Sequence, residues 1–394
     1  VPSERLNDVI YFNPADREFP IALNPLEVVN KDEAELVVSG IVSIFYKLFG
    51  TSWGPRLEYI LRNTLLTLAY IPSTTLEDVI TILTNASFRQ RIIDQTTDPV
   101  LKNFWVNEFN KMPDKLREES ISPILNKVGQ FVSSPLIRRI IGQPKSSIRL
   151  EEVMDEGKIL FANLSQGRLG EDNAALLGAM IITKIQLAAM RRVDIREELR
   201  RDFYLYVDEF QNFATTSFVK ILSEARKYRL NLYLANQYMA QIPEEVQSAI
   251  LGNAGSMIAF AVGASDAEII GKEFSEVFSQ GDLVNLSRFQ VAIKLMIDWH
   301  VTRPFFAHTL PLPDTKLQTR EAVIESSRLR WGKKFEPRVE ILNPEIIRPR
   351  PPMHHNPNTP RPNFPQNDRS RGFRPKPNDP LNPPHIPKPT ENKV

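Results

Sequence analysis

The sequence predicts an α/β protein in which a parallel sheet flanked by helices is interrupted by an all-α domain and followed by a proline-rich tail. Three observations predict this architecture. Short apolar runs alternate with helical patterns after residue 142, residues 31–141 show helical patterns alone, and proline becomes frequent after residue 343. Near-continuous apolar runs separated by helices are typical of a parallel sheet covered on both faces.

Composition narrows the class of protein. The 394 residues are 42% hydrophobic and 24% charged, as in ordinary globular proteins with more than one domain. The net charge of +2 means that any nucleic-acid surface would be a local patch. The absence of cysteine excludes disulfides and thiolate metal sites, and no two histidines have HExxH-type spacing.

The first element is a buried strand at 8–13 (DVIYFN), which ends in the turn Asn13-Pro14-Ala15-Asp16. The chain begins with Val1 and runs almost at once into this strand, so we expect a partial chain. The most apolar stretch, 174–190, is interrupted by Lys184 and Gln186. We therefore predict no membrane-spanning segment, and no signal peptide opens the chain.

An all-α unit is predicted at 31–141. Apolar residues recur at helical spacing in 34–49, 57–70, 76–83 and 100–109. Breakers separate these stretches at Gly54-Pro55, Pro72, Pro99, Pro113, Pro123 and Pro135. Thr75, with Asp78 three residues later, is a candidate N-cap.

Strands and helices alternate after Pro144. Strands are predicted at 159–164, 203–207, 230–235 and 256–262, and helices at 172–192, 217–228 and 244–251. Ligands of such sheets bind at the carboxyl ends of the strands. Residues 344–394 hold 15 of the 31 prolines and too few large apolar residues to form a core, so we predict that this tail is disordered.

The sharpest chemical signal is the run FYLYV at 203–207 followed by Asp208 and Glu209. In an ATPase the first carboxylate holds Mg²⁺, usually through water, and the second polarises the attacking water as a general base. A strand that ends in a solvated acidic turn is the alternative interpretation.

Two further polar residues belong to the same hypothesis. Gln237 follows the next strand, where a neutral donor and acceptor can touch both the γ-phosphate and the attacking water. The alternative role of Gln237 is to cap the helix near Gln241. Arg226 could reach a neighbouring subunit's nucleotide as an arginine finger, or it could be a solvated cation at a helix C-terminus.

Four segments together resemble the conjugative coupling-protein ATPases, the TraD/TraG-like family of type IV secretion. The segments are VIYFNPAD, FYLYVDEFQNF, SEARKYRLNLYLANQ and RPFFAHTLPLP, and the resemblance covers about residues 8–313. It implies a RecA-type P-loop domain interrupted by an all-α domain, with ATP and Mg²⁺ as cofactors. It also implies hexameric rings at the inner membrane that move single-stranded DNA or nucleoprotein, and contacts with relaxosome and secretion proteins.

The resemblance also implies roles and boundaries. Asp208 and Glu209 take the Walker B positions, Gln237 the sensor position and Arg226 the inter-subunit arginine position. Expected domains are 1–30 (start of the nucleotide-binding domain), 31–141 (all-α insertion), 142–343 (remainder with Walker B) and 344–394 (tail). We expect this segment to be soluble, with membrane helices further upstream and the parent protein on the cytoplasmic side of the inner membrane.

One departure concerns the phosphate-binding loop, GxxxxGK[ST]. The pairs Gly157-Lys158, Gly271-Lys272 and Gly332-Lys333 lack the other residues of this motif. The resemblance puts the loop upstream of Val1, so we expect this chain by itself not to hydrolyse ATP. A non-catalytic scaffold or adaptor with the same fold, and an unrelated helicase-like NTPase, remain alternative functions.

Aromatic and basic residues are weaker candidates for DNA contacts. Tyr228, Trp299, Phe305 and Phe306 could stack on bases, but core or strand positions are the more ordinary interpretation. The basic residues of the insertion could track a DNA backbone, or they could form a solvated face. They are Lys102, Lys111, Lys115, Arg117, Lys127, Arg138 and Arg139.

Overall fold

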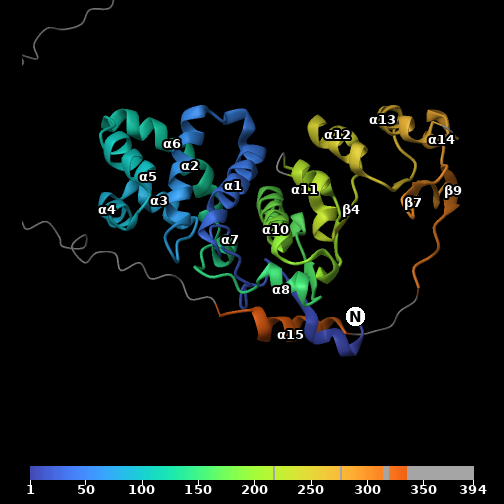
Figure 1. Ribbon diagram of the computed structural model, residues 1–394, viewed down its shortest axis with the longest axis horizontal. Coiled ribbons are helices and arrows are strands. Elements are labelled where there is room, and N and C mark those ends of the chain that lie inside the picture. The colour runs from blue at the N-terminus through green and yellow to red at the C-terminus, as the bar shows by residue number, and fades with distance from the viewer. Residues whose placement is uncertain (216–217, 276, 314–318, 335–394) are drawn as a thin grey trace, which may run out of the picture. The chain divides into compact units, whose positions relative to one another are not determined.

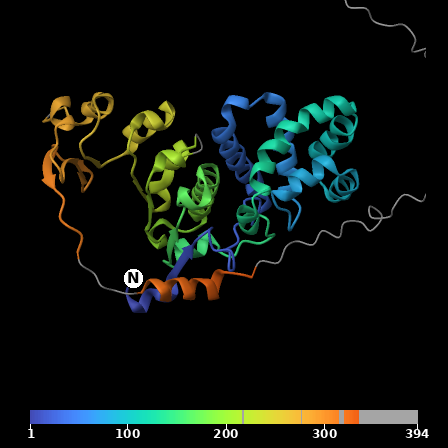
Figure 2. The same ribbon diagram turned by 180° about the vertical axis from the view of Figure 1, so that it is seen from behind.

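The computed structural model describes residues 1–215, 218–275, 277–313 and 319–334 (Figure 1; Figure 2 is the reverse view). The tail predicted at 344–394 lies outside the described residues, as does the first residue of the helix predicted at 217–228. The described part confirms an α/β fold with a helical insertion. Its strands and helices follow most of the patterns read from the sequence.

The insertion begins and ends at a pair of neighbouring strands. β1 (Val9–Phe12) lies parallel to β2 (Ile159–Ala162), with Val9 opposite Ile159 and Phe12 opposite Ala162. Val9, Ile10 and Phe12 are buried, as expected for the apolar side chains of a strand in an α/β core. The chain therefore leaves the sheet after β1 and returns beside the same strand about 150 residues later.

Residues between these strands form the helical insertion. Its helices are α1 (Ala34–Phe49), α2 (Pro55–Ala69), α3 (Glu77–Thr84), α4 (Ala86–Gln95), α5 (Pro99–Asn103), α6 (Asp114–Val132) and α7 (Pro135–Ile141), with a π-helical turn at Phe104–Phe109. α2 contacts α1, α3 and α6, as Figures 1 and 2 both show. Trp105 is fully buried, and its indole N–H donates to the Thr67 hydroxyl at 2.8 Å. This bond satisfies a polar atom that burial would otherwise penalise.

Two local predictions in the insertion need correction. Pro123 does not break a helix: α6 continues through it, and Ile121 and Ile124 are buried on either side of the proline. Burial of this apolar face offsets the lost backbone hydrogen bond, which costs about 3 kcal/mol. The N-cap of α3 is Leu76 rather than Thr75, and the Asp78 carboxylate accepts from the Thr75 backbone N–H at 2.7 Å.

The core of the α/β part is built around one long helix. After α8 (Leu150–Asp155) and α9 (Gln166–Leu169), α10 (Glu171–Arg191) buries Leu176, Leu177 and Met180 and contacts α1. By length and composition, Lys31–Ser52 and Glu171–Asp194 could each cross a membrane. Buried core helices pass the same test, and much of each helix is buried here.

The second strand pair carries the acidic motif. β3 (Phe203–Val207) is parallel to β4 (Leu230–Leu234), and α11 (Phe218–Glu224) and a 3₁₀ turn (Ala225–Tyr228) connect them. Both strands agree with the sequence prediction. The predicted burial of both faces does not hold for the described residues, because Tyr204, Tyr206 and Tyr233 are 51%, 69% and 52% exposed on one face. Tyr206 and Tyr233 stack there with ring centroids 4.4 Å apart.

The strand predicted at 256–262 also differs from expectation. β5 (Met257–Ala259) pairs antiparallel with β6 (Gln290–Lys294), which pairs antiparallel with β9 (Phe305–His308). A small hairpin, β7 (Met296–Ile297) and β8 (His300–Val301), follows β6. The remaining helices are α12 (Glu244–Asn253), α13 (Ala264–Phe274), α14 (Gln280–Val284) and α15 (Arg320–Trp331). α15 packs on β1, where the Ser327 hydroxyl accepts from the Tyr11 N–H at 2.8 Å.

Candidate functional site

The candidate site lies at the carboxyl ends of β3 and β4. Val207 is opposite Leu234, and the Ala235 N–H donates to the Val207 carbonyl at 2.9 Å. The Phe210 N–H then donates to the Ala235 carbonyl at 2.8 Å. This parallel register brings the residues that follow both strands to one edge, where α/β proteins bind their ligands.

Glu209 is the centre of this edge. Its backbone is left-handed, with φ of 51°, which turns the chain sharply after the strand. The Gln237 amide donates to Glu209 Oε1 at 2.6 Å, and the Gln211 amide donates to Oε2 at 2.5 Å. Both carboxylate oxygens therefore accept from a neutral amide, which fixes the orientation of the carboxylate without neutralising its charge.

Asp208 precedes Glu209 and is exposed at the tip of β3. Its Oδ1 accepts from the Glu209 backbone N–H at 3.0 Å. Mg²⁺ prefers hard oxygen ligands and keeps several waters, so a single exposed carboxylate beside bound phosphates is an adequate protein contribution. Asp208 fits this requirement. No group of three or more metal-binding side chains occurs in the part of the chain that the structure describes.

Gln237 is placed by the segment after β4. The short 3₁₀ turn Met239–Gln241 has Tyr238 at its N-cap and no side-chain capping bond. The recorded partner of the Gln237 amide is Glu209, on the neighbouring strand. Gln237 therefore does not cap this turn, and its amide contacts Glu209 instead; the sensor role stays a prediction.

Arg226 lies at the opposite end of the strand pair. It belongs to the 3₁₀ turn before β4, whereas Gln237 follows β4. Five residues at about 3.3 Å each separate these ends by roughly 16 Å, so Arg226 does not reach Glu209 of its own chain. Its exposed guanidinium stacks on Trp299, 3.2 Å from the ring centroid. Trp299 is in the turn between β7 and β8 and is 66% exposed, which corrects the expectation of a core or strand position.

The other aromatic candidates have structural partners. Phe305 and Phe306 are in β9, and the Phe306 ring lies 4.1 Å from that of Phe278. Tyr228 is half-buried, with Arg200 over its ring at 5.9 Å. These three side chains agree with the more ordinary interpretation of core or strand residues.

The basic residues of the insertion do not form a uniform face. Lys127 is buried, and its ammonium lies over the Phe49 ring at 5.4 Å. Arg117 pairs with Asp114, one turn earlier on the same helix. Lys102 and Lys111 are exposed. The basic set thus includes side chains that are already engaged within the helical insertion.

Sequence reasoning missed two residues that contact the site. Gln211 donates to Glu209, and the main-chain carbonyl of Gln211 accepts from the Lys47 ammonium at 2.8 Å. Lys47 is in the last turn of α1, and burial lowers its pKa to about 8. A lone lysine in an amphipathic helix carries no pattern that predicts such a contact. Gln211 was within the quoted motif, but nothing in its spacing indicated a bond to Glu209.

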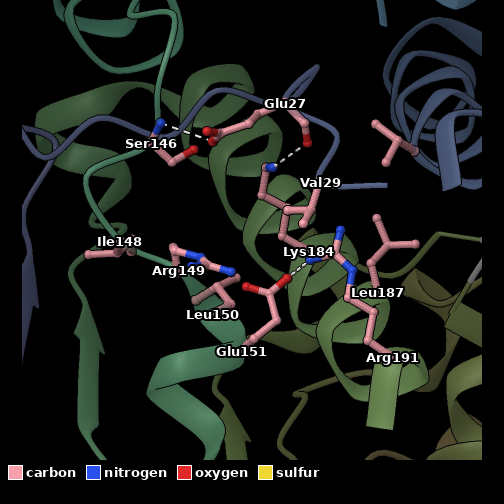
Figure 3. A pocket seen from close by; sticks show the side chains of 11 residues that line it. Glu27, Val29, Ser146, Ile148, Arg149, Leu150, Glu151, Lys184, Leu187 and Arg191 are labelled. Atoms are coloured by element: carbon pink, nitrogen blue, oxygen red, sulfur yellow. Dashed lines mark hydrogen bonds and ion pairs between the residues drawn. The ribbon is translucent and has the colours of Figure 1, made fainter. Parts of the chain in front are cut away.

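A separate cavity of about 70 Å³ lies between α1, α8, α10 and the loops before α1 and α8. Figure 3 shows Lys184 and Arg191 of α10 on one side, Glu27 above and Glu151 below. The Lys184 ammonium contacts the Glu27 carbonyl at 3.5 Å, and burial lowers the pKa of Lys184 to about 8 despite Glu27 and Glu33. Arg191 pairs with Glu33 and Glu151. None of the candidate site residues lines this cavity.

Part of the chain matches a known family model. Residues 202–290, from β3 to the start of β6, match the family model described as the TraM recognition site of TraD and TraG. A search of curated proteins found no match.

Several solved structures share the fold. The plasmid coupling protein TrwB in complex with ADP and Mg²⁺ has a TM-score of 0.52 and 12% identity, covering 77% of this chain and 76% of that one. TrwB with a non-hydrolysable ATP analogue gives 0.52 and 14% over the same shares. The unbound bacterial conjugative coupling protein TrwBdeltaN70 gives 0.50 and 12%. The chain therefore has the fold of a conjugative coupling protein, RecA-like with a helical domain, and the resemblance read from the sequence is confirmed at the level of the fold.

Proposed function

We propose that this chain is part of an ATP-driven motor that moves DNA in conjugation or type IV secretion. The observation that carries the proposal is the hydrogen bond between Gln237 and Glu209 beside Asp208, at the carboxyl edge of two parallel strands. The fold shared with TrwB, whose solved complexes contain ADP and Mg²⁺ or an ATP analogue, supports nucleotide as the ligand.

Each site residue has a role in this proposal. Mg²⁺, when bound with the nucleotide, would neutralise charge that develops on the phosphates. Asp208 would hold the hydrated ion, Glu209 would take the proton of the attacking water, and Gln237 would orient that water through its amide. Gln237 would also sense hydrolysis, because the amide that donates to Glu209 would lie beside the γ-phosphate.

Arg226 acts on a neighbouring subunit in this proposal. It lies at the strand ends opposite Glu209, so it would serve the carboxylates of a second copy rather than those of its own chain. A repeated head-to-tail contact forms a ring when its rotation closes. The resemblance implies that this ring has six subunits. The nucleotide would then sit between subunits.

The last part of the proposal concerns the cellular location and the partners of the protein. We propose that residues 202–290 contact a relaxosome protein, since the matched family model describes the TraM recognition site of TraD and TraG. We further propose that the protein acts at the cytoplasmic side of the inner membrane, as the resemblance to coupling proteins implies.

The test is ATP hydrolysis by the purified full-length protein, with and without single-stranded DNA. DNA-stimulated turnover that requires Mg²⁺ supports the motor. Partner binding without turnover would instead support the scaffold or adaptor, which is the alternative function of a different class.

A further inference from the structure

Gln211 connects the loop that follows β3 to the inserted helical domain. It lies in a 3₁₀ turn after Glu209 and is only 9% exposed. Its side-chain amide donates to Glu209 Oε2 at 2.5 Å, while its main-chain carbonyl accepts from Lys47 at 2.8 Å. The side-chain carbonyl of Gln211 is buried with no hydrogen-bond partner among the described residues. One residue is thus bonded both to the carboxylate and to α1.

The Lys47 ammonium is held by burial and by one main-chain hydrogen bond. An ammonium held away from water loses hydration free energy, and this loss lowers the pKa of Lys47 to about 8. The recorded partner that offsets the loss is a main-chain carbonyl 164 residues away in sequence. Because this acceptor is a main-chain carbonyl, the bond restrains the backbone of the loop and not only a side chain that can rotate.

Glu209 is held from two directions. Gln237 approaches Oε1 from the tip of β4, and Gln211 approaches Oε2 from within the loop. Each oxygen keeps a second lone pair, and the two amides together determine where these lone pairs point. A general base requires such orientation, because misplacement by about 1 Å can cost on the order of 100-fold in rate.

We propose that Gln211 is a positioning residue for Glu209, and that Lys47 links it to α1 of the inserted domain. A displacement of α1 moves the Lys47 ammonium, the Gln211 backbone and, through the same residue's side chain, the Glu209 carboxylate. The inserted domain thereby sets the rate of the chemical step without contacting the nucleotide. This inference rests on the proposed ATPase function.

The first experiment measures ATP turnover by the full-length protein. Lys47→Met and Gln211→Leu should each lower kcat about 10-fold or more, with KM within about 2-fold, because the lost contact orients the base and does not bind substrate. Lys47→Arg keeps a cation and should retain most of the rate. The matched control is Lys184→Met, which also removes a half-buried lysine bonded to a main-chain carbonyl, but away from the site. Equal kcat in the Lys47→Met and Lys184→Met proteins would overturn the proposal.

A double-mutant cycle separates positioning from general destabilisation. If Lys47 acts through Gln211, adding Lys47→Met to Gln211→Leu should lower kcat by less than about 2-fold more, since residues of one network are not additive. If the double variant instead lost kcat by the product of the two single effects, Lys47 would not act through Gln211.

A third measurement needs no activity. Hydrogen exchange of the amides at 208–213 in the present chain should become faster in Lys47→Met than in wild type or Lys184→Met. Unchanged exchange in this loop would overturn the link even if the enzyme were active. A wild-type protein without turnover would refute the proposed function alone, and the exchange result would still decide whether Lys47 holds the loop.

Discussion

Gln237 and Glu209 are joined by a 2.6 Å hydrogen bond although 28 residues separate them in sequence. The bond exists because β3 and β4 are parallel and in register, so both strands end at one edge. An amide that contacts a general base can orient the water that the base deprotonates. This pair is the geometric reason for proposing hydrolysis, rather than nucleotide binding alone, at this edge.

Glu209→Gln in the full-length protein should lower the rate of ATP hydrolysis by about 100- to 10,000-fold, the usual contribution of a general base. Nucleotide affinity should change little, because the substituted amide is isosteric and Asp208 remains. Steady-state hydrolysis and nucleotide-binding titrations measure the two quantities. Wild-type turnover in this variant would refute the role of Glu209 as base.

Much of this edge could be predicted from local pattern. An apolar strand followed by two acids, and a second strand followed by a polar residue, place Asp208, Glu209 and Gln237 together once the strands are parallel. The contact between Lys47 and Gln211 could not be predicted, since it depends on where the inserted helices fold back. The antiparallel pairing of β5 was also missed, because the short strand β6 has no distinctive run of apolar residues.

Arg226 is too far along the strands to serve its own Glu209, so its proposed role requires a second copy. Subunits with Arg226→Ala and subunits with Glu209→Gln should each be inactive alone. Mixtures should regain part of the wild-type hydrolysis, because some interfaces then pair an intact arginine with an intact base. Absence of rescue at every mixing ratio, with assembly confirmed by sedimentation, would rule out a role in trans.

Trp299 should hold the Arg226 guanidinium in place. A flat stack on the indole leaves the in-plane N–H groups of the arginine free to donate, and such contacts are worth about 0.5–2 kcal/mol. In the present chain, Arg226→Ala should therefore change the tryptophan emission. The same substitution in a Trp299→Phe background should change nothing, because Trp53, Trp105 and Trp331 remain as before. An equal emission change in both backgrounds would show that Arg226 and Trp299 do not stack in solution.

Lys184 should make the free energy of unfolding depend on pH in a defined window. The folded-state pKa of about 8 is below the ordinary 10.5, so the unfolded state binds more protons between these two values. The desolvation cost is therefore fully present below pH 8 and disappears as pH rises through 10.5. Lys184→Met removes this cost, so at pH 7 the variant should be more stable than wild type.

The lowering of the Lys184 pKa from 10.5 to about 8 corresponds to at most about 3.4 kcal/mol, and because the side chain is only half-buried the expected cost is on the order of 1–2 kcal/mol. Urea unfolding of wild type and Lys184→Met at pH 7, 9 and 10.5 measures it. The two stabilities should converge as pH rises. Lys102→Met, on an exposed side chain of α5, should show no such convergence. A stability difference between Lys184→Met and wild type that stayed constant with pH would mean that Lys184 is not desolvated in the folded protein.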